Sequence, residues 1–206
     1  MSDTVSPWQR KRTIYDQIAP HYDKAVAPLD RWFLAQLRAT AFGYLPEGAR
    51  VLELGAGTGL NFATYPANAA GVATEPSSGM LQIARQKIRP TGVRLVQSYA
   101  EHLPFKNDSF DAALATLVFC SLTHPTKAFA ELRRVVKSGG TVILLEHVRP
   151  RGLLGPVFDL VNLITVPLFD DHFNRRTAEV AQASGLEFMT VESSLLGIMN
   201  LIACRV

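Results

Sequence analysis

Cysteine, long apolar runs and excess charge are scarce in this sequence. Only two cysteines, Cys120 and Cys204, occur in 206 residues, which excludes the disulfide framework of a small secreted domain. No run of about 18 uninterrupted apolar residues is present, so no transmembrane helix is predicted. The first residues have no apolar core, so we expect no signal peptide and a cytoplasmic protein with reduced cysteines.

The charge balance is also modest. A formal net charge of +3 suits an anionic surface or ligand but is too small for a nucleic-acid-binding stripe. We therefore expect no nucleic acid among the partners. Hydrophobic residues make up 48% of the chain, and its length is enough for one domain with a full core.

The apolar pattern predicts strands that alternate with helices, which is typical of a mostly parallel sheet. Met80, Ala84 and Ile88 recur at a spacing of four after Ser77, a helix cap. A second helix should begin at Pro125 and end at Gly139-Gly140, and a third should run from Asn174 to just before Gly185. The expected buried strands are residues 50–54, 71–74, 93–97, 110–115 and 141–146.

The two ends of the chain depart from this alternation. Residues 187–195 and 198–206 predict a hairpin turning at Gly197, so the last strand should run antiparallel. The result is a Rossmann-like α/β fold with a seven-stranded sheet. Leu29, Phe33 and Leu37 recur at a spacing of four before the first strand, where Pro20 and Pro28 punctuate the segment. These 49 residues predict an N-terminal helical cap over the carboxyl edge of the sheet.

A glycine-rich loop follows the first expected strand. It comprises Gly55, Ala56, Gly57, Thr58 and Gly59, with Glu53 before it. The first glycine allows a tight bend, and the second lets the backbone approach a ligand. A dinucleotide fingerprint, G-x-G-x-x-G, would place the third glycine one position later. No Lys-Ser/Thr follows, which excludes a phosphate-binding P-loop.

The pattern E-x-G-x-G-x-G resembles motif I of class I S-adenosyl-L-methionine-dependent methyltransferases. The resemblance implies that the loop and Asn61 cradle the methionine portion and ribose of this cofactor. It also implies that Glu53 helps to orient the methionine ammonium group, often through water. Glu75 follows the second strand, where a carboxylate accepts the ribose hydroxyls, although the family more often has Asp there.

Further motifs resemble the ubiquinone/menaquinone methyltransferases within that family. The stretch Ala100-Glu101-His102-Leu103-Pro104-Phe105 is similar to their A-E-x-L-P-F, and residues 132–140 to their L-x-R-V-L-K-P-G-G. By this resemblance the remaining cofactor-binding residues are Pro76, Met80, Ala100, Glu101, Leu117 and Cys120.

The acceptor side rests on fewer residues. Tyr15-Asp16 and Tyr22-Asp23 resemble the Y-D-x-x-A-x-x-Y-D signature of lipid and quinone methyltransferases, including bacterial phospholipid N-methyltransferases. The resemblance implies that Tyr15 and Tyr22 lie near the methyl donor, although they could also be core aromatics. His147 is a candidate base, or an ordinary strand-end histidine.

The apolar segment 153–169 precedes the last expected helix. It either lines an acceptor pocket, lies on a membrane surface or packs against the sheet. Phe119, Phe158 and His172 are the acceptor-pocket candidates. Asp170, Asp171 and His172 lack a second ligand pair, so we expect no metal.

The basic run Arg10-Lys11-Arg12 near Trp8 is either a solvated charged end or an anchor to an anionic membrane. Peripheral contact with the inner membrane surface is therefore one expectation.

Together these features predict methyl transfer from S-adenosyl-L-methionine, with S-adenosyl-L-homocysteine as product, to a lipophilic or amphiphilic acceptor. The amine of a phosphatidylethanolamine-type phospholipid is the first candidate. The alternatives are a small hydrophobic thiol, because residues 117–122, 146–148 and 172–175 resemble methyltransferase-like thiol methyltransferases, and the ring carbon of a quinone precursor. A non-catalytic cofactor- or lipid-binding module is the competing class. The single domain, 1–206, would comprise a helical cap (1–49), a cofactor-binding core (50–148), an acceptor-side insertion and helix (149–186) and a C-terminal hairpin (187–206).

Overall fold

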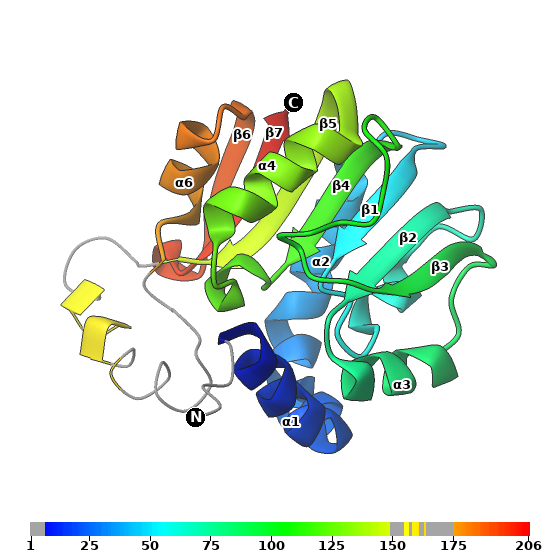
Figure 1. The fold of residues 1–206 in the computed structure, drawn as a ribbon. Coiled ribbons are helices and arrows are strands. Elements are labelled where there is room, and N and C mark those ends of the chain that lie inside the picture. Colours follow the sequence, from blue (N-terminus) through cyan, green and yellow to red (C-terminus); the bar gives the residue numbers. More distant parts are fainter. Residues whose placement is uncertain (1–6, 149–154, 157, 161–162, 164–174) are drawn as a thin grey trace, which may run out of the picture.

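The computed structural model describes residues 7–148, 155–156, 158–160, 163 and 175–206. A seven-stranded sheet runs through the molecule, with helices on both faces (Figure 1). Its strand order is β3-β2-β1-β4-β5-β7-β6. The strands are β1 Arg50–Leu54, β2 Ala70–Glu75, β3 Gly92–Gln97, β4 Phe110–Thr116, β5 Val136–His147, β6 Glu187–Ser194 and β7 Met199–Arg205.

Strands β1 to β5 pair in parallel, and β7 lies antiparallel between β5 and β6. The expected Rossmann-like sheet with an antiparallel last strand is therefore confirmed. The helical elements are α1 Pro7–Leu29, α2 Ala35–Gly43, α3 Ser78–Gln86, α4 Pro125–Val135 and α6 Thr177–Ala183, with a π turn η1 at Asp30–Leu34 and 3-10 turns η2 Leu60–Thr64, η3 Phe119–Ser121 and η4 Leu195–Gly197.

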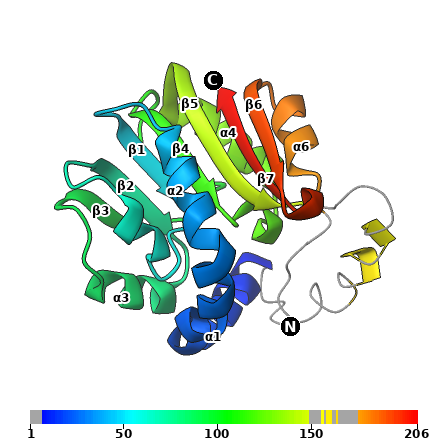
Figure 2. The ribbon, with the colours of Figure 1, turned by 180° about the vertical axis from the view of Figure 1, so that it is seen from behind.

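The core lies on both faces of the sheet because successive strand side chains point to opposite faces. In β5, Val142 and Leu144 pack in the cluster beneath α4, whereas Ile143 and Leu145 pack in the cluster beneath α2. Figures 1 and 2 show α4 and α6 over one face and α2 over the other. The cap helix α1 lies beyond the carboxyl ends of the parallel strands, against α3.

The cap is helical, as predicted, but its apolar residues at a spacing of four do not share one environment. Of the three apolar residues at a spacing of four, Leu37 packs against the core, whereas Leu29 and Phe33 are 50% and 45% exposed; Leu34 and Arg38 are buried. The helix continues through Pro20 and Pro28 and widens into the π turn. A π turn adds a residue to one helical turn, so it changes the angular position of the side chains that follow it.

Two helix ends also differ from the prediction. Ile88 is 95% exposed because α3 ends at Gln86. The helix that begins at Pro125 ends at Val135 and not at Gly139-Gly140, since these glycines belong to β5. A Cβ at Gly140 would lie 2.7 Å from the Asp111 carbonyl oxygen, so this glycine allows close strand contact.

The last helix agrees at its end, where Gly185 has a φ of +83°. Asn174, its expected cap, lies outside the described residues. Among the helices that the structure describes, none is long and apolar enough to cross a membrane. The described residues also contain no group of three side chains suited to holding a metal ion.

Candidate active site

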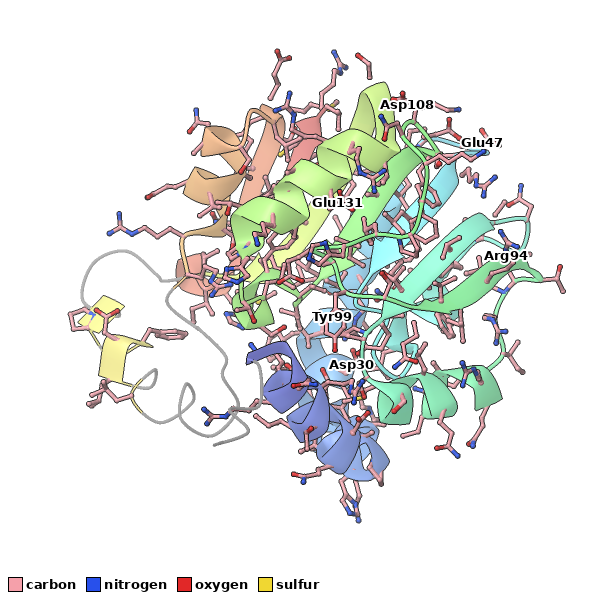
Figure 3. All side chains as sticks on the ribbon, viewed as in Figure 1. Asp30, Glu47, Arg94, Tyr99, Asp108 and Glu131 are labelled. Atoms are coloured by element: carbon pink, nitrogen blue, oxygen red, sulfur yellow. The ribbon has the colours of Figure 1, made fainter. Side chains whose placement is uncertain are left out.

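A pocket lies at the carboxyl ends of β1, β2 and β4, beneath the cap helix α1. The loops after these strands and after β3 form its wall, and α1 and α2 contribute side chains from the opposite side. Figure 3 shows Tyr99, one of the lining residues, where the loop after β3 comes against α1. The carboxyl edge of an open α/β sheet is the usual place for a ligand.

The glycine loop adopts a backbone that side chains would obstruct. Gly55, Gly57 and Gly59 have φ values of +63°, +55° and +82°, in the left-handed region. A Cβ at Gly55 would lie 2.5 Å from Val118 Cγ2, and one at Gly59 would lie 2.4 Å from Phe62 Cε2. A Cβ at Gly57 would meet nothing within 4 Å, and this residue lines the pocket. The loop therefore leaves open space beside its middle glycine.

Glu53 acts behind the pocket wall. It is fully buried, and its carboxylate accepts hydrogen bonds from Asn61 Nδ2 at 2.7 Å and Tyr65 Oη at 2.8 Å. Burial raises the pKa of Glu53. Asn61 does line the pocket, and its buried Oδ1 has no hydrogen-bond partner among the described residues. Glu53 thus fixes Asn61 so that an acceptor atom remains available.

Glu75 joins the two loops that meet at the pocket. One carboxylate oxygen accepts from the Gly57 N–H at 3.0 Å, and the other accepts from the Ser77 N–H at 2.9 Å. Burial, together with the negative charges of Asp16 and Glu53, raises the pKa of Glu75 to about 7, although the two backbone hydrogen bonds oppose this shift. This carboxyl group therefore changes its charge near neutral pH.

Arg38 is a pocket residue that the sequence analysis missed. It is only 6% exposed, lines the pocket and forms an ion pair with Asp30 (labelled in Figure 3). Burial lowers the pKa of its guanidinium. The signal that could have indicated it is a charged residue at helical spacing from Leu34 and Ala41, two apolar residues. Lys11 and Arg12, predicted as a solvated charged end or a membrane anchor, also line the pocket.

Most of the predicted site residues come together. Those that line the pocket are Tyr15, Tyr22, Gly55, Ala56, Gly57, Thr58, Asn61, Glu75, Pro76, Met80, Ala100, Glu101 and Leu117. Six predicted site residues that the structure describes do not line the pocket: Glu53, Gly59, Phe119, Cys120, His147 and Phe158. Cys120 is buried, with its sulfur 3.5 Å from the Leu117 carbonyl oxygen. His172 lies outside the described residues.

Glu146 was not predicted, although it precedes His147 directly. Its Oε1 accepts hydrogen bonds from the backbone N–H groups of Val118 and Phe119, at 2.9 and 3.0 Å. Burial raises the pKa of Glu146 to about 7. Because Val118 lines the pocket, this buried carboxyl group shapes the wall after β4.

The fold and the glycine loop together define a class I methyltransferase architecture, and comparisons with known proteins agree. A family model described as "Methyltransferase domain" matches residues 52–144. A solved S-adenosylmethionine-dependent methyltransferase from Thermotoga maritima superposes with a TM-score of 0.75 at 26% identity, covering 95% of this chain and 99% of that one.

Curated relatives narrow the family. A ubiquinone/menaquinone biosynthesis C-methyltransferase from Syntrophotalea carbinolica is 32% identical over 97% of this chain and 88% of its own length. A phosphatidylethanolamine N-methyltransferase from Cereibacter sphaeroides is 34% identical, covering 58% of this chain and 62% of the relative. A demethylmenaquinone methyltransferase from Clavibacter sepedonicus is also 34% identical, and this chain spans 58% of its length.

The chain therefore belongs to the class I S-adenosyl-L-methionine-dependent methyltransferases of the ubiquinone/menaquinone and phospholipid N-methyltransferase type. S-adenosyl-L-methionine is the cofactor of this family.

Proposed function

We propose that this protein transfers the methyl group of S-adenosyl-L-methionine to a lipophilic or amphiphilic acceptor, foremost the amine of a phosphatidylethanolamine-type phospholipid. The observation that carries the proposal is the mixed wall of the pocket. It combines a cofactor-type loop with Tyr15 and Tyr22 and with the cations Lys11 and Arg12. An acceptor with a phosphate beside its amine suits these cations and hydroxyls.

The side chains of the wall fit the cofactor. Asn61 Oδ1 can accept from the methionine ammonium group, and the Arg38 guanidinium can pair with the methionine carboxylate. Glu75, when ionised, can accept both ribose hydroxyls. Gly57 leaves room for the cofactor to lie against the backbone. The adenine would lie along Met80, Ala100 and Glu101.

The bound cofactor supplies a methyl group that is already activated by its sulfonium leaving group. The protein therefore has to position the nucleophile and to exclude water. The cap helix does both, and the hydroxyls of Tyr15 and Tyr22 are the groups that we assign to holding the amine. An amine attacks only as the free base, so its ammonium proton must first pass to solvent water. His147 is not among the described lining residues, and we assign it no direct proton transfer.

Carbon methylation of a quinone precursor is the second candidate. The relative from Syntrophotalea carbinolica carries a C-methyltransferase name and covers 97% of this chain. A small hydrophobic thiol is the third. The competing class, a module that binds the cofactor or a lipid without turnover, lacks a specific observation in its favour.

A single assay ranks these acceptors. The full chain is incubated with methyl-labelled cofactor and, separately, phosphatidylethanolamine vesicles, an alkyl thiol and a demethylquinone. We expect label in the phospholipid. Label in the quinone or the thiol alone would replace the phospholipid proposal, and cofactor binding without label in any acceptor would favour the binding module.

Replacing the two cations separates phosphate recognition from chemistry. We expect Lys11→Gln and Arg12→Gln to raise KM for the phospholipid more than KM for the cofactor, although Arg12 also lies 3.9 Å from Asp16. A matched control is Arg176→Gln, which removes an exposed cation whose ion-pair partner among the described residues is Glu179. An equal effect of all three substitutions would contradict phosphate recognition by the cap.

We further propose that the cap contacts an anionic membrane surface from the cytoplasm. Leu29, Trp32 and Phe33 are 50%, 75% and 45% exposed, and exposed apolar patches mark interaction surfaces. Between residues 24 and 36 the exposed charged residues are the cations Lys24 and Arg31. The acidic residue of this stretch, Asp30, forms an ion pair with the buried Arg38. Apolar and basic side chains together suit anionic lipid.

Vesicle co-sedimentation tests this contact. We expect Trp32→Ser with Phe33→Ser to weaken binding to anionic vesicles, whereas Ile88→Ser should not. Ile88 is the control because it is 95% exposed but lies after α3. Equal binding of wild-type protein to anionic and neutral vesicles would refute the proposed contact.

A further inference from the structure

The cap helix carries two Tyr-Asp pairs, and the tyrosine and the aspartate of each pair have different contacts. Tyr15 and Tyr22 line the pocket. Asp16 and Asp23, each the next residue, contact the two segments that form the cofactor side of the pocket. Seven residues make about two helical turns, so the pairs repeat on nearly the same face of α1.

Asp16 holds the start of α3. Its Oδ1 accepts from Ser77 Oγ at 2.6 Å, from the Gly79 N–H at 2.8 Å and from Ser78 Oγ at 3.3 Å. Although burial raises the pKa of Asp16, these hydrogen bonds outweigh it and hold that pKa below its usual value. Ser77 already caps its own helix through the Met80 N–H at 3.1 Å. Asp16 therefore satisfies a second free N–H of the same helix end from another element.

Gly79 allows this contact. A Cβ at this position would lie 3.0 Å from the Asp16 carbonyl oxygen, 3.1 Å from Asp16 Cα and 3.3 Å from Ala19 Cβ. Ala19 is only 2% exposed, so little space remains between the two helices. The backbone of α1 thus lies directly on the first turn of α3.

Asp23 makes the corresponding contact with the glycine loop. Its Oδ1 accepts a hydrogen bond from Thr58 Oγ1, and its other oxygen lies 2.6 Å from Lys87 Nζ. Thr58 is 1% exposed and follows Gly57. The second aspartate thus connects α1 to the loop after β1, as the first connects it to the loop after β2.

We propose that Asp16 and Asp23 are positioning residues that fasten α1 to both cofactor-holding loops and so hold Tyr15 and Tyr22 over the pocket. Neither aspartate needs to touch a reacting atom. Because the contacted loops also carry Gly57 and Glu75, seating of the cap and binding of the cofactor stabilise each other. The inference rests on the proposed cofactor site and is independent of the acceptor.

The test measures S-adenosyl-L-homocysteine affinity by calorimetry and hydrogen exchange of residues 7–29, with and without this ligand. We expect Asp16→Ala to weaken binding about tenfold or more and to speed exchange in α1 in the bound protein. Asp16→Asn keeps an oxygen acceptor for the Gly79 N–H and should restore most of the affinity. This rescue would not follow if any change at Asp16 simply unfolded the cap.

Asp111→Ala is the matched control. Asp111 also accepts from a backbone N–H, that of Arg50 at 2.8 Å, and pairs with Lys137 at 2.6 Å, but it is not among the described lining residues. It should leave affinity and α1 exchange unchanged. If Asp111→Ala and Asp16→Ala have the same effect, or if Asp16→Ala leaves both measurements at wild-type values, the proposal is overturned.

Gly79→Ala separates the cap contact from helix stability. Alanine favours helix more than glycine does, so α3 should not be weakened. Its Cβ should still push α1 away, which lowers ligand affinity and speeds exchange of residues 7–29. Wild-type affinity in this variant would contradict the close seating of α1. If the wild-type protein does not bind S-adenosyl-L-homocysteine at all, the proposed cofactor site itself is refuted.

Discussion

The charge of Glu75 should make cofactor affinity depend on pH near neutrality. Its pKa is raised to about 7 by burial and by the charges of Asp16 and Glu53. Only the ionised carboxylate accepts hydrogen bonds from both ribose hydroxyls, so the ligand should bind the deprotonated form. As pH falls through 7, Glu75 gains a proton and affinity should be lost.

The size of the effect follows from the ionised fraction. With a pKa of about 7, Glu75 is about 90% ionised at pH 8 and about 10% ionised at pH 6. Affinity for S-adenosyl-L-homocysteine should therefore fall about tenfold, or ~1.4 kcal/mol, between these pH values. Binding at pH 6 should also release close to one proton per site, which calorimetry detects in buffers of different ionisation enthalpy.

Two variants assign this pH dependence to the correct carboxyl group. Glu75→Gln should bind the ligand more weakly and with little change between pH 6 and 8. Glu53→Gln removes a neighbouring charge that raises the pKa of Glu75, so this variant should keep a pH dependence but shift it to lower pH. Wild-type affinity that is constant between pH 6 and 8, or a slope that survives in Glu75→Gln, would refute the reasoning.

Three other substitutions give separate readouts. Gly57→Val should abolish measurable ligand binding, since the valine side chain would enter the pocket. The left-handed backbone at this position should also lower the free energy of unfolding of the variant by about 1–2 kcal/mol. Arg38→Gln should weaken binding of S-adenosyl-L-homocysteine by about 10- to 100-fold in calorimetry. Binding of methylthioadenosine, which lacks the carboxylate, should not change. Equal losses for the two ligands would exclude the carboxylate contact. The pKa of Glu146 is raised to about 7, so the folded state binds more protons than the unfolded state between about pH 5 and 7. The contribution of this residue to the free energy of unfolding should therefore fall as pH rises through that window. Urea titrations at several pH values should show that the free energy of unfolding of Glu146→Gln depends less on pH than that of the wild-type protein.

The sheet could be predicted because its information is local. The strand expected at residues 50–54 has the observed bounds of β1, and the turn at Gly197 separates β6 from β7 as expected. Short apolar runs bounded by glycine and polar residues are sufficient for such predictions. The loop glycines could be predicted for the same reason, since their left-handed backbone is a property of single residues.

The cap could be predicted as helical but not in its phase. A π turn occupies Asp30–Leu34; Phe33 within it is exposed, and Arg38 one turn after it lines the pocket. Whether a helical turn closes with four or five residues depends on packing against other elements, which periodicity in one segment does not encode. Because the phase of the cap could not be predicted, the buried arginine could not be predicted either.

The cofactor and acceptor halves of the site differ in how far apart their contacting residues lie in the sequence. The carboxylate of Glu75 contacts Ser77, two residues away, and Gly57, 18 residues away. The contact between Asp16 and the Gly79 N–H instead joins residues 63 positions apart. A family motif can therefore indicate Tyr15 and Asp16 as a pair, but only the tertiary structure separates them into a residue that lines the pocket and a residue that holds the helix. Acceptor selection depends on such long-range placement, so it has to be measured on the folded protein.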